Sequence, residues 1–232
     1  MPTKINLLYA KTGIHGGNQA YLFKAFIEVE KSAGKKQVIL HYTDTLSNLG
    51  WRDKAASYLG PLPDNRECWV VDLAYGSPGF STFDLNIIFA VRYVDKSGEY
   101  WDSNDGNNYT VAIAGLYNFN TPHYLLKSVD VALNDATVAN KVFSGRIAVK
   151  NIAYQKVVKV LFTTDNWVAN HEISAVYNSS TANGDELWTF NTPVAETVKN
   201  ISFAVSCLVN EITYWDNNCG LNYAVKNPGE LF

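Results

Sequence analysis

The sequence YWDNNCGLNY at residues 214–223 recurs in diverged form as YWDSNDGNNY at residues 100–109. Both copies follow the pattern Y-W-D-x-N-x-G-x-N-Y without a gap. Aspartate, asparagine and glycine in this order favour a tight turn, and two adjacent aromatic residues on a strand place one ring on each face of a sheet. The pattern therefore predicts a β-hairpin turn in each half of the chain.

The same residue types also suit the recognition of a sugar. An aromatic ring offers a flat apolar platform for the C–H face of a sugar, and carboxamides can both donate and accept hydrogen bonds to its hydroxyl groups. The hairpin interpretation and the sugar-binding interpretation are compatible, because turn residues can carry a site.

Further matched segments indicate a tandem duplication. Phe23–Val29 aligns with Phe143–Val149, Trp51 with Trp167, and residues 88–91 with 202–205. Each copy spans roughly 115 residues, which is the size of an ordinary domain. We place the boundary near Asn118–Pro122, giving domains at 1–120 and 121–232.

Strand patterns dominate both halves. Apolar residues alternate with smaller or polar ones at 87–93 and again at 201–209. Residues 19–31 could form an amphipathic helix, but their partner segment contains Ser144-Gly145 and fits a strand better. About seven short strands in each half predict an all-β fold, two tandem antiparallel immunoglobulin-like β-sandwiches.

Composition limits the classes of function. The chain has 232 residues, 47% of them hydrophobic, and a net charge of −3, which gives no electrostatic reason to expect a nucleic-acid partner. Neither a signal-peptide h-region nor an apolar run long enough to insert into a membrane is evident. The three cysteines, Cys68, Cys207 and Cys219, show no C-x-x-C spacing, so we expect free thiols and a cytoplasmic protein.

No catalytic or metal-binding motif is recognisable. The sequence lacks G-x-S-x-G, P-loop and H-E-x-x-H patterns, and its four histidines show no ligand spacing. Asp102 and Asp216 are expected to bind turn amides rather than to act as acids. We therefore predict no enzyme activity, no cofactor and no metal.

Several segments of the second half resemble one known family. These are VFSGRIAVKNIAYQK at 142–156, DNW at 165–167, LWTF at 187–190 and the Tyr-Trp-Asp-Asn-Asn turn. Together they resemble the family 21 carbohydrate-binding module, the starch- and glycogen-binding domain of some fungal glucoamylases and of glycogen-targeting subunits of protein phosphatase 1. The resemblance covers roughly residues 130–225, and it is fainter in the first half.

The resemblance implies a β-sandwich with up to two α-glucan sites. The main site in the second half would consist of Trp167, Tyr214, Trp215, Asn217 and Asn222, with Asn151 at its edge. A second site would use Tyr154 and Tyr177. The first half would keep only Trp51, Tyr100, Trp101, Asn104 and Asn108.

This sequence departs from the family pattern at some of these positions. Cys219 replaces an asparagine ligand, Ala204 stands where a binding tyrosine can occur, and Asp185 replaces an aromatic residue of the second site. In the first half, Lys31, Ser103 and Asp105 stand in for asparagines, and Ala33-Gly34 occupies the place of Tyr154. These changes affect the expected preference for starch.

We predict a lectin-like, non-enzymatic protein that binds neutral glycans, with α-glucans such as starch, glycogen and maltooligosaccharides as leading candidates. Trp51 and Trp167 are expected to be exposed, and Trp69 and Trp188 to lie in the cores. Two alternatives are a scaffold that targets a protein phosphatase to glycogen and a binding fragment of an amylolytic enzyme. The sequence K-V-L-F at 159–162 fits a phosphatase docking motif but lies in an expected internal strand. Homo-oligomerisation is left open.

Overall fold

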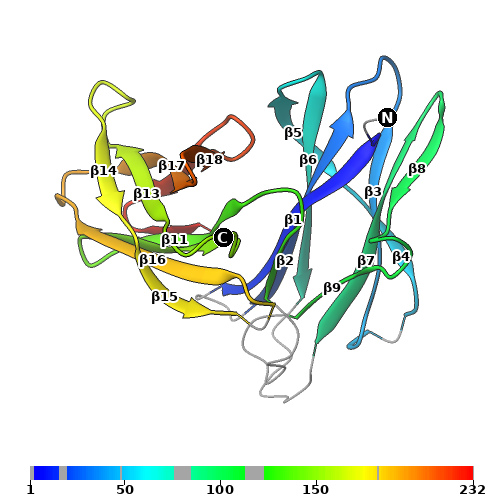
Figure 1. The fold of residues 1–232 in the computed structure, drawn as a ribbon, viewed down its shortest axis with the longest axis horizontal. Coiled ribbons are helices and arrows are strands. Elements are labelled where there is room, and N and C mark those ends of the chain that lie inside the picture. Colours follow the sequence, from blue (N-terminus) through cyan, green and yellow to red (C-terminus); the bar gives the residue numbers. More distant parts are fainter. Residues whose placement is uncertain are drawn as a thin grey trace. The chain divides into compact units, whose positions relative to one another are not determined.

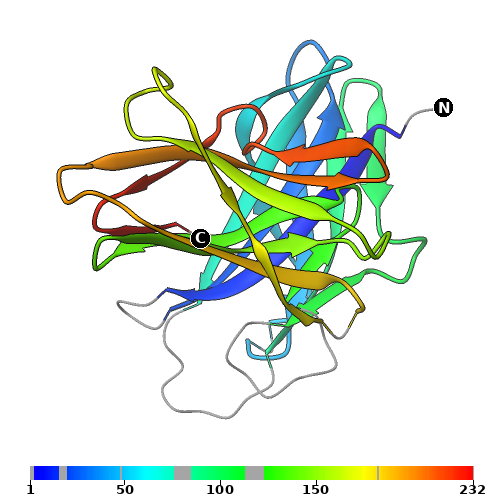
Figure 2. The same ribbon diagram turned by 60° about the vertical axis from the view of Figure 1, so that its left-hand side comes forward.

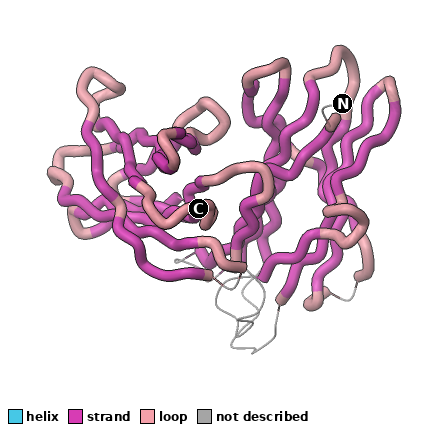
Figure 3. The backbone as a smooth tube through the Cα atoms, viewed as in Figure 1, coloured by secondary structure: helices cyan, strands magenta, loops and turns pink. Residues whose placement is uncertain are grey.

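The computed structural model describes residues 3–15, 20–47, 49–75, 85–112, 123–181 and 183–231. Within these ranges the chain forms β-strands and connecting loops without a helix (Figure 1 and Figure 3), which confirms the predicted all-β class. The chain divides into two compact units, residues 1–128 and 129–232. The boundary predicted after residue 120 lies outside the described residues.

The first unit contains two antiparallel sheets. One has the strand order β10-β1-β2-β6-β5, and the other has the order β4-β3-β7-β8 with β9 also paired to β7. The strands are β1 (Ile5–His15), β2 (Ala20–Glu30), β3 (Gln37–Asp44), β4 (Arg52–Ala55), β5 (Ser57–Leu62), β6 (Arg66–Tyr75), β7 (Asn86–Asp95), β8 (Gly98–Asp102), β9 (Tyr109–Ala112) and β10 (Tyr124–Leu126).

The second unit has the same design, and Figure 2 shows its strands from a second direction. Its sheets have the orders β15-β16-β12-β11-β20 and β14-β13-β17-β18, with β19 also paired to β17. The strands are β11 (Val131–Ala139), β12 (Val142–Val149), β13 (Val157–Thr163), β14 (His171–Ser174), β15 (Val176–Ser180), β16 (Glu186–Pro193), β17 (Asn200–Val209), β18 (Ile212–Asp216), β19 (Tyr223–Lys226) and β20 (Gly229–Leu231).

Strands β1 to β10 correspond in order and pairing to β11 to β20, as a tandem duplication requires. Residues 20–30 form strand β2, as the second copy predicted. The expectation of about seven strands per half was too low, because short edge strands such as β10 and β20 carry too few residues to show a period of two.

Each unit has its own hydrophobic core between its two sheets. In the second unit, Phe143 contacts the rings of Phe162, Phe190 and Phe203 at centroid distances of 5.7, 5.1 and 5.1 Å. Gly145 permits this packing, since a Cβ atom there would lie 2.7 Å from Phe190 Cζ. A larger residue at position 145 would therefore disrupt the core of the second unit. The rest of strand β12 has good strand-forming residues.

The repeated Y-W-D turn is not a hairpin, which corrects the first prediction from its sequence. Strands β18 and β19 both pair with β17, Asp216 opposite Val205 and Tyr223 opposite Phe203. The turn at 217–222 therefore leaves the sheet after β18 and returns to it at β19, on the same side of β17. Strands β8 and β9 pair with β7 in the same way.

The prediction of three free thiols is wrong for two of the cysteines. Cys207 is free and buried, whereas Cys68 and Cys219 are disulfide-bonded. The cysteines therefore no longer support the predicted cytoplasmic location.

Candidate functional site

An aspartate organises the repeated turn in each unit, and that of the second unit, Asp216, is buried. Asp216 Oδ2 accepts hydrogen bonds from Leu133 N and Tyr223 Oη, both at 2.7 Å, and Asp216 Oδ1 accepts one from Asn218 N at 3.2 Å. Leu133 N is available because β11 has a bulge between Leu133 and Asp135. The predicted role of Asp216 in binding turn amides is thus confirmed.

The first unit repeats this arrangement with different residues. Asp102 accepts from Leu7 N at 2.7 Å, Tyr109 Oη at 2.6 Å and Asn104 N at 3.4 Å. A bulge in β1 follows Leu7. Desolvation and the bond to Asp102 raise the pKa of Tyr109, so its phenol stays a donor at neutral pH.

Trp215 and Tyr214 point to opposite faces of their sheet. The Trp215 side chain is 52% exposed, whereas Tyr214 packs against the hydrophobic core. Trp101 and Tyr100 divide in the same way, with Tyr100 against the first core. Because neighbouring residues on a strand alternate in direction, Tyr214 and Tyr100 do not share the outer face of their tryptophans. The prediction of one ring on each face is confirmed, and the role of Tyr214 and Tyr100 in a sugar site stays a prediction.

The asparagines of the 217–222 turn form hydrogen bonds within the turn itself. Asn218 Nδ2 donates to Asn222 O at 3.1 Å, and Asn217 Oδ1 accepts from Gly220 N at 2.8 Å. Asn218 and Asn222 have φ of 53° and 57°, a left-handed conformation that asparagine tolerates better than most residues. The amides therefore shape the turn as well as presenting hydrogen-bonding groups.

In the first unit, Asn104 uses both ends of its amide within the protein. Its Nδ2 donates to Asn108 O at 3.1 Å, and its Oδ1 accepts from Lys127 Nζ at 3.3 Å. Asn108 has φ of 60°. Asn104 thus holds the turn, and Asn108 takes the same backbone conformation as Asn222 in the second unit.

Trp167 is presented by a strained loop between β13 and β14. Asn166 and Trp167 have φ of 58° and 70°, which is costly for a tryptophan. Asp165 Oδ1 compensates by accepting from Ala169 N at 3.0 Å and from Thr163 Oγ1 at 2.7 Å. These bonds, led by that from Ala169, lower the pKa of Asp165. The Trp167 side chain is 39% exposed, as predicted.

Sheet register places the Trp167 loop and the 217–222 turn on the two sides of β17, within a few residues of each other along that strand. Phe162, at the end of β13, lies opposite Phe203, and Phe203 lies opposite Tyr223. A groove of about 410 Å³ adjoins the loop. It is lined by Thr163, Thr164, Asn166, Thr197, Val198, Lys199, Asn200 and Ser202. We call the exposed part of this region, carried by Trp167 and Trp215, the indole surface.

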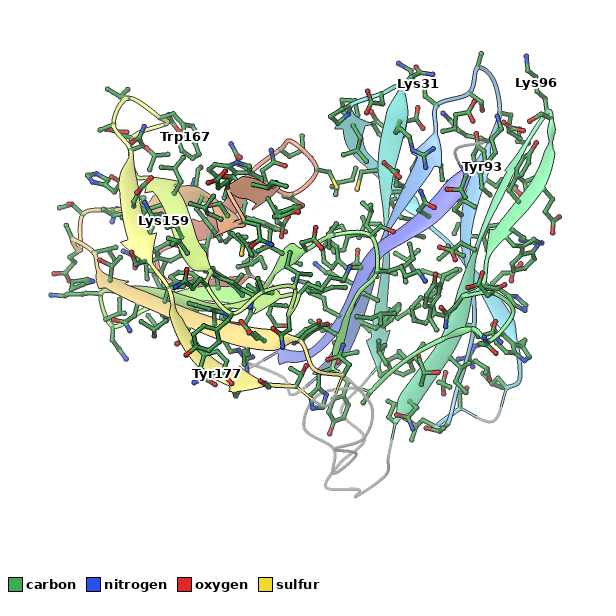
Figure 4. The ribbon with its side chains drawn as sticks, in the orientation of Figure 1. Lys31, Tyr93, Lys96, Lys159, Trp167 and Tyr177 are labelled. Atoms are coloured by element: carbon green, nitrogen blue, oxygen red, sulfur yellow. The ribbon has the colours of Figure 1, made fainter. Side chains whose placement is uncertain are left out.

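The opposite end of the second unit holds a larger groove. It has a volume of about 980 Å³, and its lining includes Tyr154, Tyr177, Trp188, Leu208 and Asn210. Tyr154 is 99% exposed and Tyr177 52% exposed. Figure 4 shows Tyr177 and Trp167 at opposite ends of the unit. We call this region the tyrosine groove.

A buried ion pair supports the tyrosine groove. Lys156 Nζ lies 2.8 Å from Glu186 Oε1, and Trp188 Nε1 donates to Glu186 Oε2 at 2.8 Å. Lys156 Nζ also donates to Ala153 O, beside Tyr154. The Tyr177 ring meets the Trp188 ring edge-on at 6.1 Å. One network therefore supports both walls of the groove.

The first unit repeats this network. Lys36 Nζ lies 2.6 Å from Glu67 Oε2, Trp69 Nε1 donates to the same oxygen at 3.2 Å, and the Tyr58 ring meets the Trp69 ring edge-on at 5.7 Å. Sequence reasoning missed these residues, although the repeated Glu-x-Trp pattern at 67–69 and 186–188 was a usable signal. Trp69 and Trp188 are only partly buried, so their assignment to the cores was incomplete.

Asn151 lies with the tyrosine groove rather than with the Trp167 loop. Its Oδ1 accepts from Lys156 Nζ at 3.4 Å, and its loop enters β13 at the end opposite Thr163. The place of Asn151 at the edge of the main site stays a prediction.

The two tryptophans of the first unit meet through a residue that the sequence did not single out. Trp51 and Trp101 are 46% and 45% exposed, and the His41 ring contacts both.

Among the described residues no group of His, Cys, Asp and Glu could hold a metal ion. In the same residues no helix is long and apolar enough to cross a membrane.

Comparison with known proteins places the second unit in a recognised group. Residues 125–226 match the model of the carbohydrate/starch-binding module (family 21), which confirms the resemblance found in the sequence. Protein phosphatase 1 regulatory subunit 3B from Mus musculus is 30% identical over 117 residues, covering 46% of this chain and 41% of the relative. The Xenopus tropicalis protein of the same name is 31% identical over 105 residues, covering 43% and 35%. The chain thus spans less than half the length of these relatives.

Solved structures with similarity include the starch-binding domain of Rhizopus oryzae glucoamylase in complex with β-cyclodextrin and maltoheptaose. It is 34% identical, with a TM-score of 0.39, covering 44% of this chain and 97% of that one. The carbohydrate-binding module of the muscle glycogen-targeting subunit of Protein Phosphatase-1 is 23% identical, with a TM-score of 0.37, covering 43% and 77%.

Proposed function

We propose that this chain, whose residues 125–226 match the family 21 carbohydrate/starch-binding module, is a non-catalytic protein that binds neutral α-glucans through exposed tryptophans in both units. The observation that carries the proposal is the indole surface of the second unit. Trp167 is held by a strained loop and Trp215 projects from the outer face of β18, beside a turn rich in amides.

The chemistry of this surface fits a neutral sugar. Indole faces stack on the apolar faces of sugar rings, and the adjoining groove supplies hydroxyl and amide groups for hydrogen bonds. The tyrosine groove offers a second contact area, with Tyr154 and Tyr177 on its walls. In the first unit, Trp51 and Trp101 provide the corresponding rings.

Calorimetric titration of the purified chain with maltoheptaose tests the proposal, with cellohexaose as the β-linked control. We expect binding of maltoheptaose and weaker binding of cellohexaose. The affinity should change little between about 20 and 150 mM salt, because stacking and neutral hydrogen bonds are not screened by ions. Loss of binding at the higher salt concentration would indicate a charged ligand and contradict the proposal.

Targeting of protein phosphatase 1 is a second candidate, favoured by the names of the relatives. The K-V-L-F sequence does not provide the docking peptide, because Val160 is fully buried and Phe162 is 8% exposed in β13. That strand is paired on both sides, with β14 and β17. We expect no binding of the phosphatase catalytic subunit to the folded chain through residues 159–162, and co-precipitation that depends on Lys159 would contradict this expectation.

A further inference from the structure

His41 links the two exposed tryptophans of the first unit. It lies on the outer face of β3, and its ring stacks on Trp51 with a centroid distance of 4.8 Å and an interplanar angle of 8°. The same ring meets Trp101 edge-on at 5.6 Å and 87°. Trp51 directly precedes β4 and Trp101 belongs to β8, so one imidazole joins rings from separate elements.

Charged side chains connect these rings in a closed series of contacts, which we call the circuit. His41 Nδ1 lies 2.7 Å from Asp53 Oδ1, and Arg92 Nη2 donates to Asp53 Oδ2 at 2.5 Å. The Arg92 guanidinium in turn lies 5.3 Å from the centre of the Trp101 ring. Trp101 Nε1 donates to Glu99 Oε1 at 2.7 Å. The orientation of each indole is thereby defined by a polar contact or a ring contact.

The second unit lacks this circuit. In its sheet, Leu161 lies opposite Glu172 where His41 lies opposite Asp53, and Ser206 lies opposite Trp215 where Arg92 lies opposite Trp101. Neither Leu161 nor Ser206 can be charged in the physiological range. The two units therefore present their tryptophans by different means, although their backbones correspond.

We propose that His41 is a positioning residue that holds Trp51 and Trp101 of the first unit as one binding surface. This inference rests on the proposed glycan-binding function. The imidazole supports the face of Trp51, whose own loop offers little packing because nearly half of the side chain is exposed. Without the imidazole, the two indoles lose the group that joins them.

Groups on three strands hold the His41 ring between the two indoles. Asp53 on β4 is the acceptor at its Nδ1, Arg92 on β7 shares that carboxylate, and Glu99 on β8 reaches Trp101 and Arg92. A leucine at position 41 could make neither the bond to Asp53 nor the ring contacts.

The test uses the full chain with the second-unit surfaces removed. This background carries Trp167→Ala, Trp215→Ala, Tyr154→Ala and Tyr177→Ala. Maltoheptaose affinity is measured with His41 intact, as His41→Phe and as His41→Leu. The chain carrying Trp51→Ala and Trp101→Ala, with the second unit intact, serves as the control, in which adding His41→Leu should leave the affinity unchanged.

We expect His41→Leu to weaken binding roughly two- to tenfold, the range of one aromatic contact. His41→Phe should retain most of the affinity, since it keeps the ring contact. Unchanged affinity in His41→Leu would overturn the inference while leaving glycan binding established.

A measurement without ligand separates the two claims. Tryptophan fluorescence of the same background should change in His41→Leu, because both indoles lose the ring contact, and should change much less in His41→Phe. If His41→Leu changes the fluorescence but the background does not bind maltoheptaose, the proposed function of the first unit fails and the inference about its binding surface fails with it. If His41→Leu leaves the fluorescence unchanged, His41 does not hold the two indoles, and the inference is wrong.

Discussion

Trp215 and Tyr214 are neighbours in sequence with opposite structural roles, and their substitution should separate binding from folding. Trp215→Ala removes an exposed ring, so we expect glucan affinity of the second unit to fall roughly ten- to a hundredfold, by analogy with about 1–3 kcal/mol per stacked base on other aromatic platforms, without a change in melting temperature. Tyr214→Ala removes a ring packed on the core and should lower the melting temperature. Calorimetry and thermal unfolding measured together check both. A Trp215→Ala chain that unfolds would show that the ring is structural.

Cys207 is predicted to be unreactive in the folded protein. Burial raises its pKa to about 11, so little of the reactive thiolate exists at pH 8. We expect a thiol reagent to label Cys207 at pH 8 only after a denaturant is added, whereas rapid labelling of the native chain would contradict its buried position. The disulfide-bonded Cys68 and Cys219 serve as the internal control, since without a reductant they should not react in either state.

At the scale of single elements, the β13–β14 loop depends on Asp165. Its lowered pKa means that the carboxylate stabilises the loop at pH values above the ordinary aspartate range, and that this support is lost as the pH falls below about 4. Asp165→Ala should therefore weaken binding that depends on Trp167 at neutral pH while leaving the two sheets folded. Glucan titration at pH 7 and far-ultraviolet circular dichroism check this expectation. Full affinity in Asp165→Ala would mean that the strained conformation of Trp167 does not require the carboxylate.

The ion pair beneath the tyrosine groove should matter more than an exposed pair on the same unit. The Lys156 side chain is fully buried and that of Glu186 is 12% exposed, so Lys156→Met leaves a carboxylate without its partner and should cost roughly 3 kcal/mol of unfolding free energy. Lys159→Met breaks the pair with Glu172, whose side chains are 40% and 56% exposed, and should cost less than about 1 kcal/mol. Denaturant unfolding distinguishes the two. Equal losses of unfolding free energy would show that the buried pair contributes no more to stability than the exposed pair.

Much of the element structure could be predicted from sequence, because strand periodicity and the duplicated turn are local signals. Residues 20–30 form a strand, and Asp216 binds turn amides, as expected. The contribution of His41 could not be found by composition or spacing, because it acts through contacts between separate strands. Glu67 and Glu186 were marked by the repeated Glu-x-Trp pattern, but their lysine partners were not. The directions of Tyr100 and Tyr214 were predictable, since alternation along a strand requires them to oppose their tryptophans, and the structure confirms them.

For the whole molecule, the duplication should raise the affinity for polymers. A single shallow sugar surface binds weakly, because few atoms are buried and the desolvation of polar groups offsets their hydrogen bonds. Two surfaces on one chain can raise the apparent affinity for a polymer by roughly 10² to 10⁴ when both bind at once. The two units present their tryptophans differently, so they need not have equal affinities.

The most direct test compares three full-length proteins on glycogen and on maltoheptaose: the intact chain, Trp51→Ala with Trp101→Ala, and Trp167→Ala with Trp215→Ala. If both units bind glucan, each variant should lose at least tenfold in affinity for glycogen relative to the intact chain, and each should still bind maltoheptaose. Full glycogen affinity in the Trp51→Ala, Trp101→Ala protein would contradict this account, because it would show that the tryptophans of the first unit take no part in binding.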